Sequence, residues 1–198
     1  KVELQPSGFF NYITNKIDLK AVAPSPDATP GVVSYRYDNF KNVMTYGGDF
    51  TINYTWKKLS ASAGVLLTQF ETFDESIKEK TIKNLSPDAN ARIGYTIPKA
   101  EIAVNVFYKY TGRRAVFSMN SSLSTGFVDG FHTVDITASR SFWKNRIQLT
   151  VGGKNLANVT NINAQNVSGA AHSAGGSGGL MVNRGRTFFV SLVLQYTK

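Results

Sequence analysis

The chain has 198 residues, of which 42% are hydrophobic, 12% aromatic and 18% charged, and it contains no cysteine. The charged share is below the ~25% of an ordinary soluble domain, and the lack of cysteine excludes disulfides, a thiolate nucleophile and a cysteine metal site. The net charge of +9 comes from basic residues scattered through turns and loops, so no nucleic-acid groove is predicted.

No run of about 18 apolar residues is present, so no transmembrane helix is predicted. A membrane can also be crossed by strands of about 9–11 residues in which apolar and polar side chains alternate. The chain opens Lys-Val-Glu-Leu-Gln-Pro, without the apolar segment of a signal peptide. Such an opening is expected of a mature N-terminus or of an internal cut.

Alternation with a period of two residues is the dominant pattern, and it predicts β-strands. The clearest case lies near the C-terminus, where Phe188, Val190 and Leu192 alternate with Thr187 and Ser191. In chain order, the pattern predicts strands at about 9–20, 50–56, 59–68, 90–95, 101–110, 133–139, 147–152 and 187–196. The expected fold class is all-β, with about eight antiparallel strands and no helix.

The connections between these strands alternate strictly between short and long. The short ones are Lys57-Lys58, the turn around Pro98-Lys99, and Lys144-Asn145. The long ones are about 21–45, 70–88, 111–130 and 155–184. A transmembrane β-barrel has short turns on its periplasmic side and long loops outside, so odd strands are expected to run outward and the C-terminus to end in the periplasm.

Aromatic residues gather near both ends of the predicted strands, as in the two aromatic belts of a membrane barrel. Those beside the short turns are Trp56, Tyr95, Trp143 and Tyr196. Those near the long connections are Phe70, Phe73, Tyr108, Tyr110 and Phe131. The alternative explanation is that aromatic residues are simply common in strands.

Three segments resemble the TonB-dependent outer-membrane receptors. Residues 151–161 (Val-Gly-Gly-Lys-Asn-Leu-Ala-Asn-Val-Thr-Asn) resemble that family's penultimate-strand ending, with Ala157 in place of the usual aromatic residue. Residues 185–192 (Gly-Arg-Thr-Phe-Phe-Val-Ser-Leu) resemble its closing strand, and Tyr46–Asp49 with the following strand is similar to a mid-barrel glycine pattern. The closing strand also resembles the signal read by the barrel-assembly machinery.

The resemblance implies a barrel of about 22 strands around a plugged lumen. Residues 1–198 would be its C-terminal portion, and the N-terminal plug and the earlier strands would be absent. The alternative is a self-contained eight-stranded structural or adhesive barrel filled by its own side chains. A soluble β-sandwich that acts as a binding module is a third hypothesis.

The function implied by the resemblance is active uptake of a scarce nutrient across the outer membrane of a Gram-negative bacterium. Siderophore-bound iron, haem, a cobalamin-type chelate and a glycan all remain open as ligands, with small chelates favoured. The implied partners are outer-membrane lipid and lipopolysaccharide, the chain's own plug and remaining strands, the TonB complex through a TonB box, the barrel-assembly machinery and a surface lipoprotein.

Catalytic chemistry is not indicated, so we expect no enzyme, no cofactor and no metal site. His132 and Asp135 are three residues apart on one strand, and their side chains therefore point to opposite faces. His172 lies in a loop of Gly, Ser and Ala. Residues 175–179 are glycine-rich but open no helix and lack the Lys-Ser/Thr of a phosphate loop.

Candidate functional residues follow from chemistry and strand parity. Arg and Tyr in long connections can stack on a ligand and bind its anionic groups; the alternative is that they are solvated loop residues near lipopolysaccharide phosphates. The ligand-binding candidates are Tyr35, Arg36, Tyr37, Arg113 and Arg114. The residues expected to face the lumen are Thr51, Asn53, Asn90, Arg92, Asn105, Asp135 and Gln148. Those expected to face lipid are Ile52, Val104, Ile136, Leu149, Val190 and Leu192.

Overall fold

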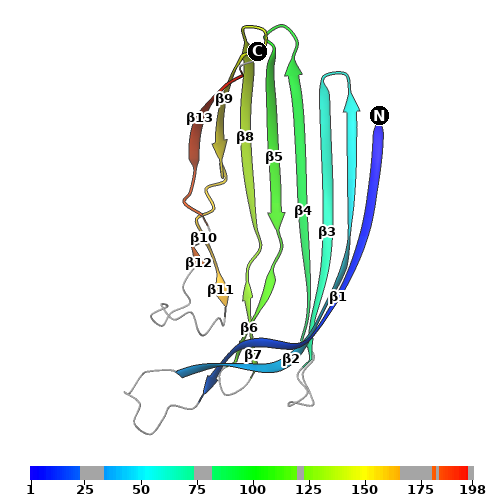
Figure 1. Cartoon of the computed structure of the whole chain (residues 1–198), viewed down its shortest axis with the longest axis vertical. Helices are drawn as coiled ribbons and strands as arrows, with labels where there is room; N and C mark the ends of the chain where they lie inside the picture. The colour runs from blue at the N-terminus through cyan, green and yellow to red at the C-terminus, as the bar shows by residue number, and fades with distance from the viewer. Residues whose placement is uncertain (23–33, 74–81, 120–122, 166–179, 182, 196–198) are drawn as a thin grey trace.

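A single antiparallel sheet of eight strands dominates the computed structural model, in the order β1-β2-β3-β4-β5-β8-β9-β13 (Figure 1). The structure describes residues 1–22, 34–73, 82–119, 123–165, 180–181 and 183–195. The sheet strands are β1 (Val2–Val22), β2 (Ser34–Trp56), β3 (Leu59–Phe73), β4 (Ile82–Ile97), β5 (Ile102–Thr111), β8 (Phe131–Phe142), β9 (Ile147–Lys154) and β13 (Thr187–Leu194). The predicted all-β class and the eight predicted strands are confirmed.

Smaller strands occupy two connections that the sequence pattern left as loops. Between β5 and β8, the hairpin of β6 (Arg114–Met119) and β7 (Leu123–Val128) is joined by β11 (Ala164–Gln165). Beyond β9, β10 (Asn161–Ile162) pairs with β12 (Leu180–Met181). Strands this short carry too few alternating positions to be recognised from sequence.

The strands extend well past the predicted boundaries: β2, β3 and β4 mainly at the end away from the short turns, and β1 mainly towards them. The first strand was expected at about 9–20 and spans Val2–Val22, and the second was expected from residue 50 and begins at Ser34. Much of the connections predicted at 21–45 and 70–88 is therefore strand. A strand that projects beyond lipid has water on both faces, so its sequence need not alternate.

The pairing register separates two faces, because directly paired residues lie on the same side of a sheet. One row joins Ile52, Ala63, Ala91 and Tyr108 across β2 to β5. The adjacent row joins Asn53, Ser62, Arg92, Phe107 and Asp135 across β2 to β8. We call the side of the first row the apolar face and the side of the second row the polar face.

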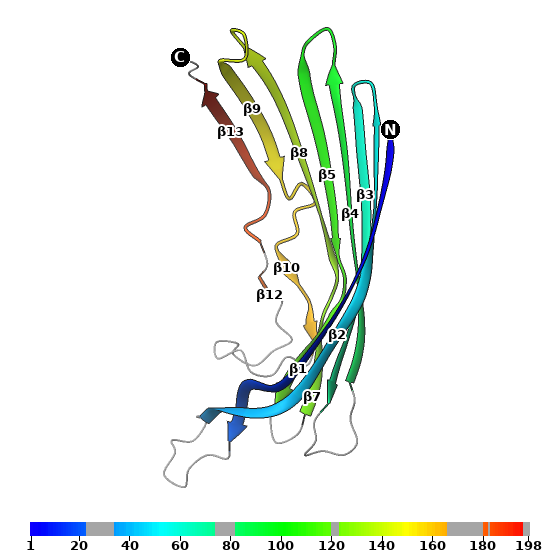
Figure 2. The ribbon, with the colours of Figure 1, turned by 45° about the vertical axis from the view of Figure 1, so that its right-hand side comes forward.

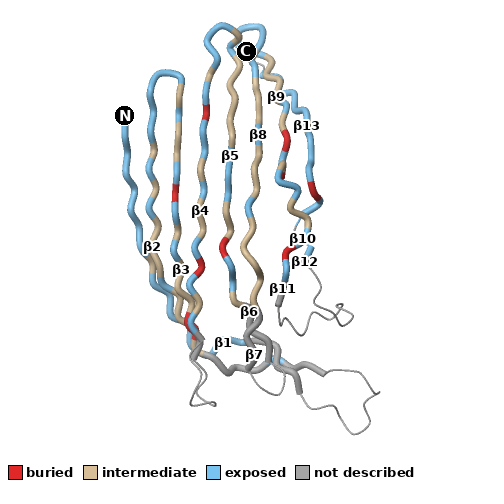
Figure 3. Tube along the Cα trace, turned by 180° about the vertical axis from the view of Figure 1, so that it is seen from behind, coloured by how far each residue is buried: buried red, intermediate tan, exposed pale blue. Residues whose placement is uncertain are grey.

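No second layer covers the apolar face within the described residues. Val65, Ile93 and Val190 are 52%, 54% and 72% exposed, and Val43 and Ile162 are the buried hydrophobic side chains of the described part. Figure 3 shows the strands of the sheet as mainly exposed or half-buried. A soluble sheet buries its apolar face against another layer, whereas a barrel wall turns this face to lipid. The chain is therefore part of a transmembrane barrel wall.

Within the described residues, no helix is long and apolar enough to cross a membrane.

The sheet is open in the part of the chain that the structure describes. β1 pairs with β2 and β13 pairs with β9, and no pairing joins β1 to β13. Figure 2 shows these two strands at opposite edges of the sheet. An unpaired strand edge leaves backbone groups unsatisfied in lipid, so the described arrangement is not the closed barrel of the self-contained alternative.

The three short turns lie together at one end of the sheet, as the alternation of connection lengths predicted (Figure 1). We call this the short-turn end and the opposite end the long-loop end. Trp56, Tyr95 and Trp143 lie beside these turns and are 57%, 47% and 76% exposed. Tyr196 lies outside the described residues.

The assignment of faces can be tested with arginine substitutions. Val190→Arg should destabilise the folded protein by ~2–4 kcal/mol, because it places a charge on the apolar face near the bilayer midplane. Leu149→Arg should cost less than Val190→Arg, because Leu149 pairs with Arg140 closer to the short turns. Thr137→Arg on the polar face is the matched control and should cost less. The measurement is the unfolding free energy in lipid vesicles, and equal costs on the two faces would contradict the assignment.

Candidate functional site

All seven residues predicted to face the lumen share the polar face. Thr51 and Asn53 pair with Gly64 and Ser62, and the polar face then continues through β4, β5, β8 and β9. Gly64 makes room for neighbouring polar groups, since a Cβ there would lie 2.9 Å from Thr51 Oγ1 and 3.1 Å from Asn90 Nδ2. Larger side chains at this point would displace the polar groups from the centre of the face.

Arg92 is the main cation at the centre of the polar face. Its Nη2 donates to Asn105 Oδ1 at 3.1 Å, and its guanidinium lies 5.2 Å from the centre of the Phe107 ring. Arg92 is nevertheless exposed. The arrangement holds the guanidinium in a fixed place while leaving it accessible to a carboxylate or to another polar surface.

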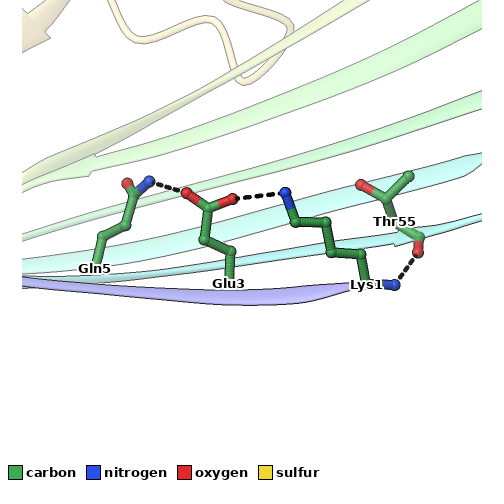
Figure 4. A network of polar contacts seen from close by, with 4 residues as sticks. All are labelled: Lys1, Glu3, Gln5 and Thr55. Atoms are coloured by element: carbon green, nitrogen blue, oxygen red, sulfur yellow. Dashed lines mark hydrogen bonds and ion pairs between the residues drawn. The ribbon is translucent and has the colours of Figure 1, made fainter.

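β1 adds a polar row that the sequence pattern missed. Glu3 pairs in register with Asn53 and therefore lies on the polar face. Its carboxylate accepts a 2.5 Å hydrogen bond from Gln5 Nε2 and lies 3.6 Å from Lys1 Nζ (Figure 4). Ser7 Oγ donates to the Asp49 carboxylate further along. The predicted first strand began at about residue 9, so these side chains were assigned to no face.

Among the residues predicted to face the lumen, Asp135 binds the backbone of a loop. Its Oδ1 accepts a 2.7 Å hydrogen bond from the backbone N–H of Asn155. Asn155 is 2% exposed and adopts a left-handed backbone conformation with a φ of 51°. Its side chain donates to Val159 O at 2.9 Å and accepts from Val159 N at 3.0 Å, which closes a tight loop after β9.

The same loop is tied to β13. Asn158 Oδ1 accepts from Arg186 N at 3.4 Å, and Arg186 Nε donates to Leu156 O at 2.9 Å. Gly185 has a φ of +85°, which favours glycine, and it packs beside Asn158. The Lys-Asn-Leu-Ala-Asn segment and the Gly-Arg segment that resembled family motifs therefore contact each other, and they position β9 against β13.

Arg113 and Arg114 are both engaged by neighbouring groups at the long-loop end. Arg113 lies 3.8 Å from an Asp129 carboxylate oxygen and 4.0 Å from the centre of the Phe127 ring. Arg114 pairs with Asp88 at 3.1 Å, and Asp88 also accepts from Gly112 N at 2.8 Å. These contacts hold the β6–β7 hairpin on the sheet, and both arginines remain about half exposed.

Tyr35, Arg36 and Tyr37 lie within β2 rather than before it. They pair with Ala21, Lys20 and Leu19 of β1. These parts of β1 and β2, residues 17–22 and 34–41, form a two-stranded arm that bends away from the sheet and crosses towards β6 (Figures 1 and 2). Tyr37 is 75% exposed, and the side chains of Tyr35 and Arg36 lie outside the described part.

The bend of the arm has a local cause. The β1–β2 register shifts between Ile13 and Lys16, where Asn15 has a φ of 53°. Asn15 N donates to Asn42 Oδ1 at 3.3 Å across the shift. A bulge of this kind bends its strand and increases the local twist, and here it directs the arm across the long-loop end, where β1 contacts β6.

A buried carboxylate, paired with an exposed lysine, marks the point where the apolar face ends. Glu71 has the parity of the apolar face, but its side chain is only 5% exposed and lies 3.2 Å from Lys83 Nζ. Tyr46 Oη donates to Glu71 Oε1 at 2.9 Å. A buried carboxylate requires such partners. These contacts join β2, β3 and β4 at the end of the sheet next to the arm.

The apolar face also has a groove, which is separate from these polar groups. It has a volume of about 560 Å³ and is lined by residues of β8, β9 and β13 together with Leu156. His132 and Asp135 have opposite strand parities, and His172 is outside the described residues. Among the described residues, no group of three or more His, Asp or Glu could hold a metal ion.

Comparison with known proteins agrees with this architecture. Residues 3–156 match the family described as TonB dependent receptor-like, beta-barrel, and the chain therefore belongs to that family. No protein with a curated function matches the sequence. The fold is similar to that of the FrpB iron transporter from Neisseria meningitidis (F3-3 variant), with a TM-score of 0.64 and 14% identity over 96% of this chain. The chain spans 27% of the length of that transporter chain.

The loop centred on Asn155 makes a testable contribution to stability. Asn155→Ala should destabilise the protein by about 2–4 kcal/mol, because it removes two hydrogen bonds from a buried loop and places alanine at a positive φ. Asn161→Ala is a suitable control, since Asn161 is exposed and its side chain only approaches Thr160 Oγ1 at 3.5 Å. Unfolding in detergent measures both, and similar losses would argue against the proposed role of Asn155.

Proposed function

We propose that the protein takes part in TonB-coupled uptake of a scarce nutrient chelate across the outer membrane of a Gram-negative bacterium. The observation that carries the proposal is the family match over residues 3–156, on a sheet that has one uncovered apolar face and one polar face. In this proposal the chain is the C-terminal part of the barrel wall. β1 and β13 pair with barrel strands outside residues 1–198, and a plug packs against the polar face.

The polar face suits a plug because it combines fixed charges with small residues. Arg92, Glu3 and Gln148 offer groups of different charge to a partner surface, and Gly64 and Gly94 keep parts of the face shallow. A hydrated interface of this kind can rearrange at modest cost, because water replaces lost hydrogen bonds. Energy for the rearrangement would come from the inner membrane through TonB.

Ligand capture is assigned to the long-loop end. The arm carries Tyr35, Arg36 and Tyr37 past the hairpin that starts at Arg114. Tyrosine and arginine are the residue types that most often dominate binding energy at interfaces, and arginine binds carboxylates and other oxyanions in a bidentate manner. Arg113 and Arg114 already have acidic partners, so the arm is the better candidate for first contact with ligand.

The ligand class that fits best is an anionic iron chelate. The net charge of +9 favours anions, and long-range attraction of this kind raises association rates. The structural neighbour is an iron transporter by name. Haem and cobalamin-type chelates are the next candidates. Further proposed partners are lipopolysaccharide, the barrel-assembly machinery through β13, and a surface lipoprotein.

Binding and uptake by the intact protein test the proposal. Replacing Tyr35, Arg36 and Tyr37 together by alanine should weaken chelate binding by roughly tenfold or more, as expected for loss of aromatic and arginine contacts. The measurements are titration of the purified protein with ferric siderophores, haem and cobalamin, and accumulation of radioactive iron by cells with and without TonB.

Arg184→Ala is the matched control, because Arg184 is an exposed arginine that was not assigned to the ligand site. It should leave binding and uptake unchanged. TonB-independent accumulation, or failure of all three ligand classes to bind, would refute the proposed function. Wild-type binding by the triple variant would refute only the assignment of the arm.

A further inference from the structure

The three short turns carry an uneven distribution of charge. Their cations are Lys57, Lys58, Lys99, Lys144 and Arg146, and Glu101 is the acidic residue among them. All six are exposed. The turns follow β2, β4 and β8, so the cations are spread along one end of the sheet rather than concentrated at one point.

The cations of the short turns differ in ion pairing from other cations of the described chain. Lys1, which contacts Thr55 near the short-turn end, lies 3.6 Å from Glu3. At the long-loop end, Lys83, Arg113 and Arg114 each lie within 4 Å of a carboxylate oxygen. Within the described ranges, none of the five turn cations has such a partner. Lys57 instead lies over the Trp56 ring, with its Nζ 5.1 Å from the ring centre. The charge of the five turn cations is therefore not neutralised by ion pairs within the described residues.

Neighbouring aromatic residues show at what depth these cations lie. Trp56 and Trp143 directly precede Lys57 and Lys144 and are both exposed. Tryptophan in membrane proteins concentrates at the level of the lipid headgroups. Arg140 is exposed on the apolar face, where it pairs with Ile102, and its guanidinium lies 5.1 Å from the Phe142 ring centre. A long arginine side chain of this kind can extend to the headgroup level.

We infer that the short-turn end is a docking surface for the anionic phospholipid headgroups of the adjacent leaflet. The headgroup phosphates would supply the negative charge that the protein does not. Ion contacts at this level are stronger than in bulk water, because the hydrocarbon layer lies beside them. The inference depends on the membrane-spanning sheet and is independent of the proposed uptake function.

Lipid retention by the intact protein tests the inference. The protein is reconstituted in vesicles of phosphatidylcholine mixed with phosphatidylglycerol, extracted in mild detergent, and the bound lipids are quantified by mass spectrometry. The wild type should retain phosphatidylglycerol in excess of its share in the vesicle. Lys57→Gln combined with Lys99→Gln and Lys144→Gln, one change in each turn, should reduce that enrichment by roughly fivefold or more.

A control with the same loss of charge is available at the long-loop end. Lys109→Gln combined with Lys154→Gln and Arg184→Gln removes three exposed cations away from the short turns and should keep the enrichment. No enrichment in the wild type, or equal loss in both triple variants, would overturn the inference.

The salt dependence of phosphatidylglycerol retention tests the inference on the wild-type protein alone. Because the Debye length is about 3 Å at 1 M salt, high salt during extraction should abolish phosphatidylglycerol enrichment by the wild type. Enrichment that persists in high salt would overturn an electrostatic docking surface, even if the turn variant failed to fold. A soluble acidic protein captured at the turns in place of lipid would count against it as well.

Discussion

Within a hydrocarbon layer no water is available to pair with a backbone amide or carbonyl, so each of these groups must find a partner in the protein. The eight-stranded antiparallel ladder of this chain meets that requirement along its interior strands, β2 to β9. The same ladder forces successive side chains to opposite faces. One face is therefore free to match lipid and the other to match a polar partner, and the exposure of Val190 and the hydrogen bond of Arg92 are consequences of that division.

The polar contacts that fix the sheet lie where the constraint of lipid ends. Glu71 pairs with Lys83, Asp88 holds Gly112 and Arg114, and Asp135 holds the backbone of Asn155. Glu71 and Lys83 reinforce a continuous β3–β4 ladder, whereas at Asp88 and Asp135 a neighbouring strand ends and side chains supply the contacts that the backbone ladder no longer makes. The family-like segment after β9 is one such place, because buried Asn155 closes a loop that no backbone pairing would close.

Charge is organised differently at the two ends of the sheet. At the long-loop end, Lys83, Arg113 and Arg114 are paired with acids and hold the hairpin and the strands in place. The five cations of the short turns have no such partner in the described chain, and Lys57 lies over the Trp56 ring. A scattered net positive charge thus has two physical roles: internal support at one end and attraction of external anions at the other.

The fold class, the number of sheet strands and their faces could be predicted from the amino-acid pattern, because lipid on one side imposes a period of two that is visible in segments such as 187–194. The sequence also indicated the short-turn end, since tight turns leave few residues between strands. The pairing of the structure was needed to show how far β2 extends, since a strand with water on both faces need not alternate, and to add residues 2–8 to β1 through their pairing with β2. It also decided that Arg113, Arg114 and Asp135 have partners, because Asp129, Asp88 and Asn155 lie between 16 and 26 residues away and meet them only through the register of the sheet.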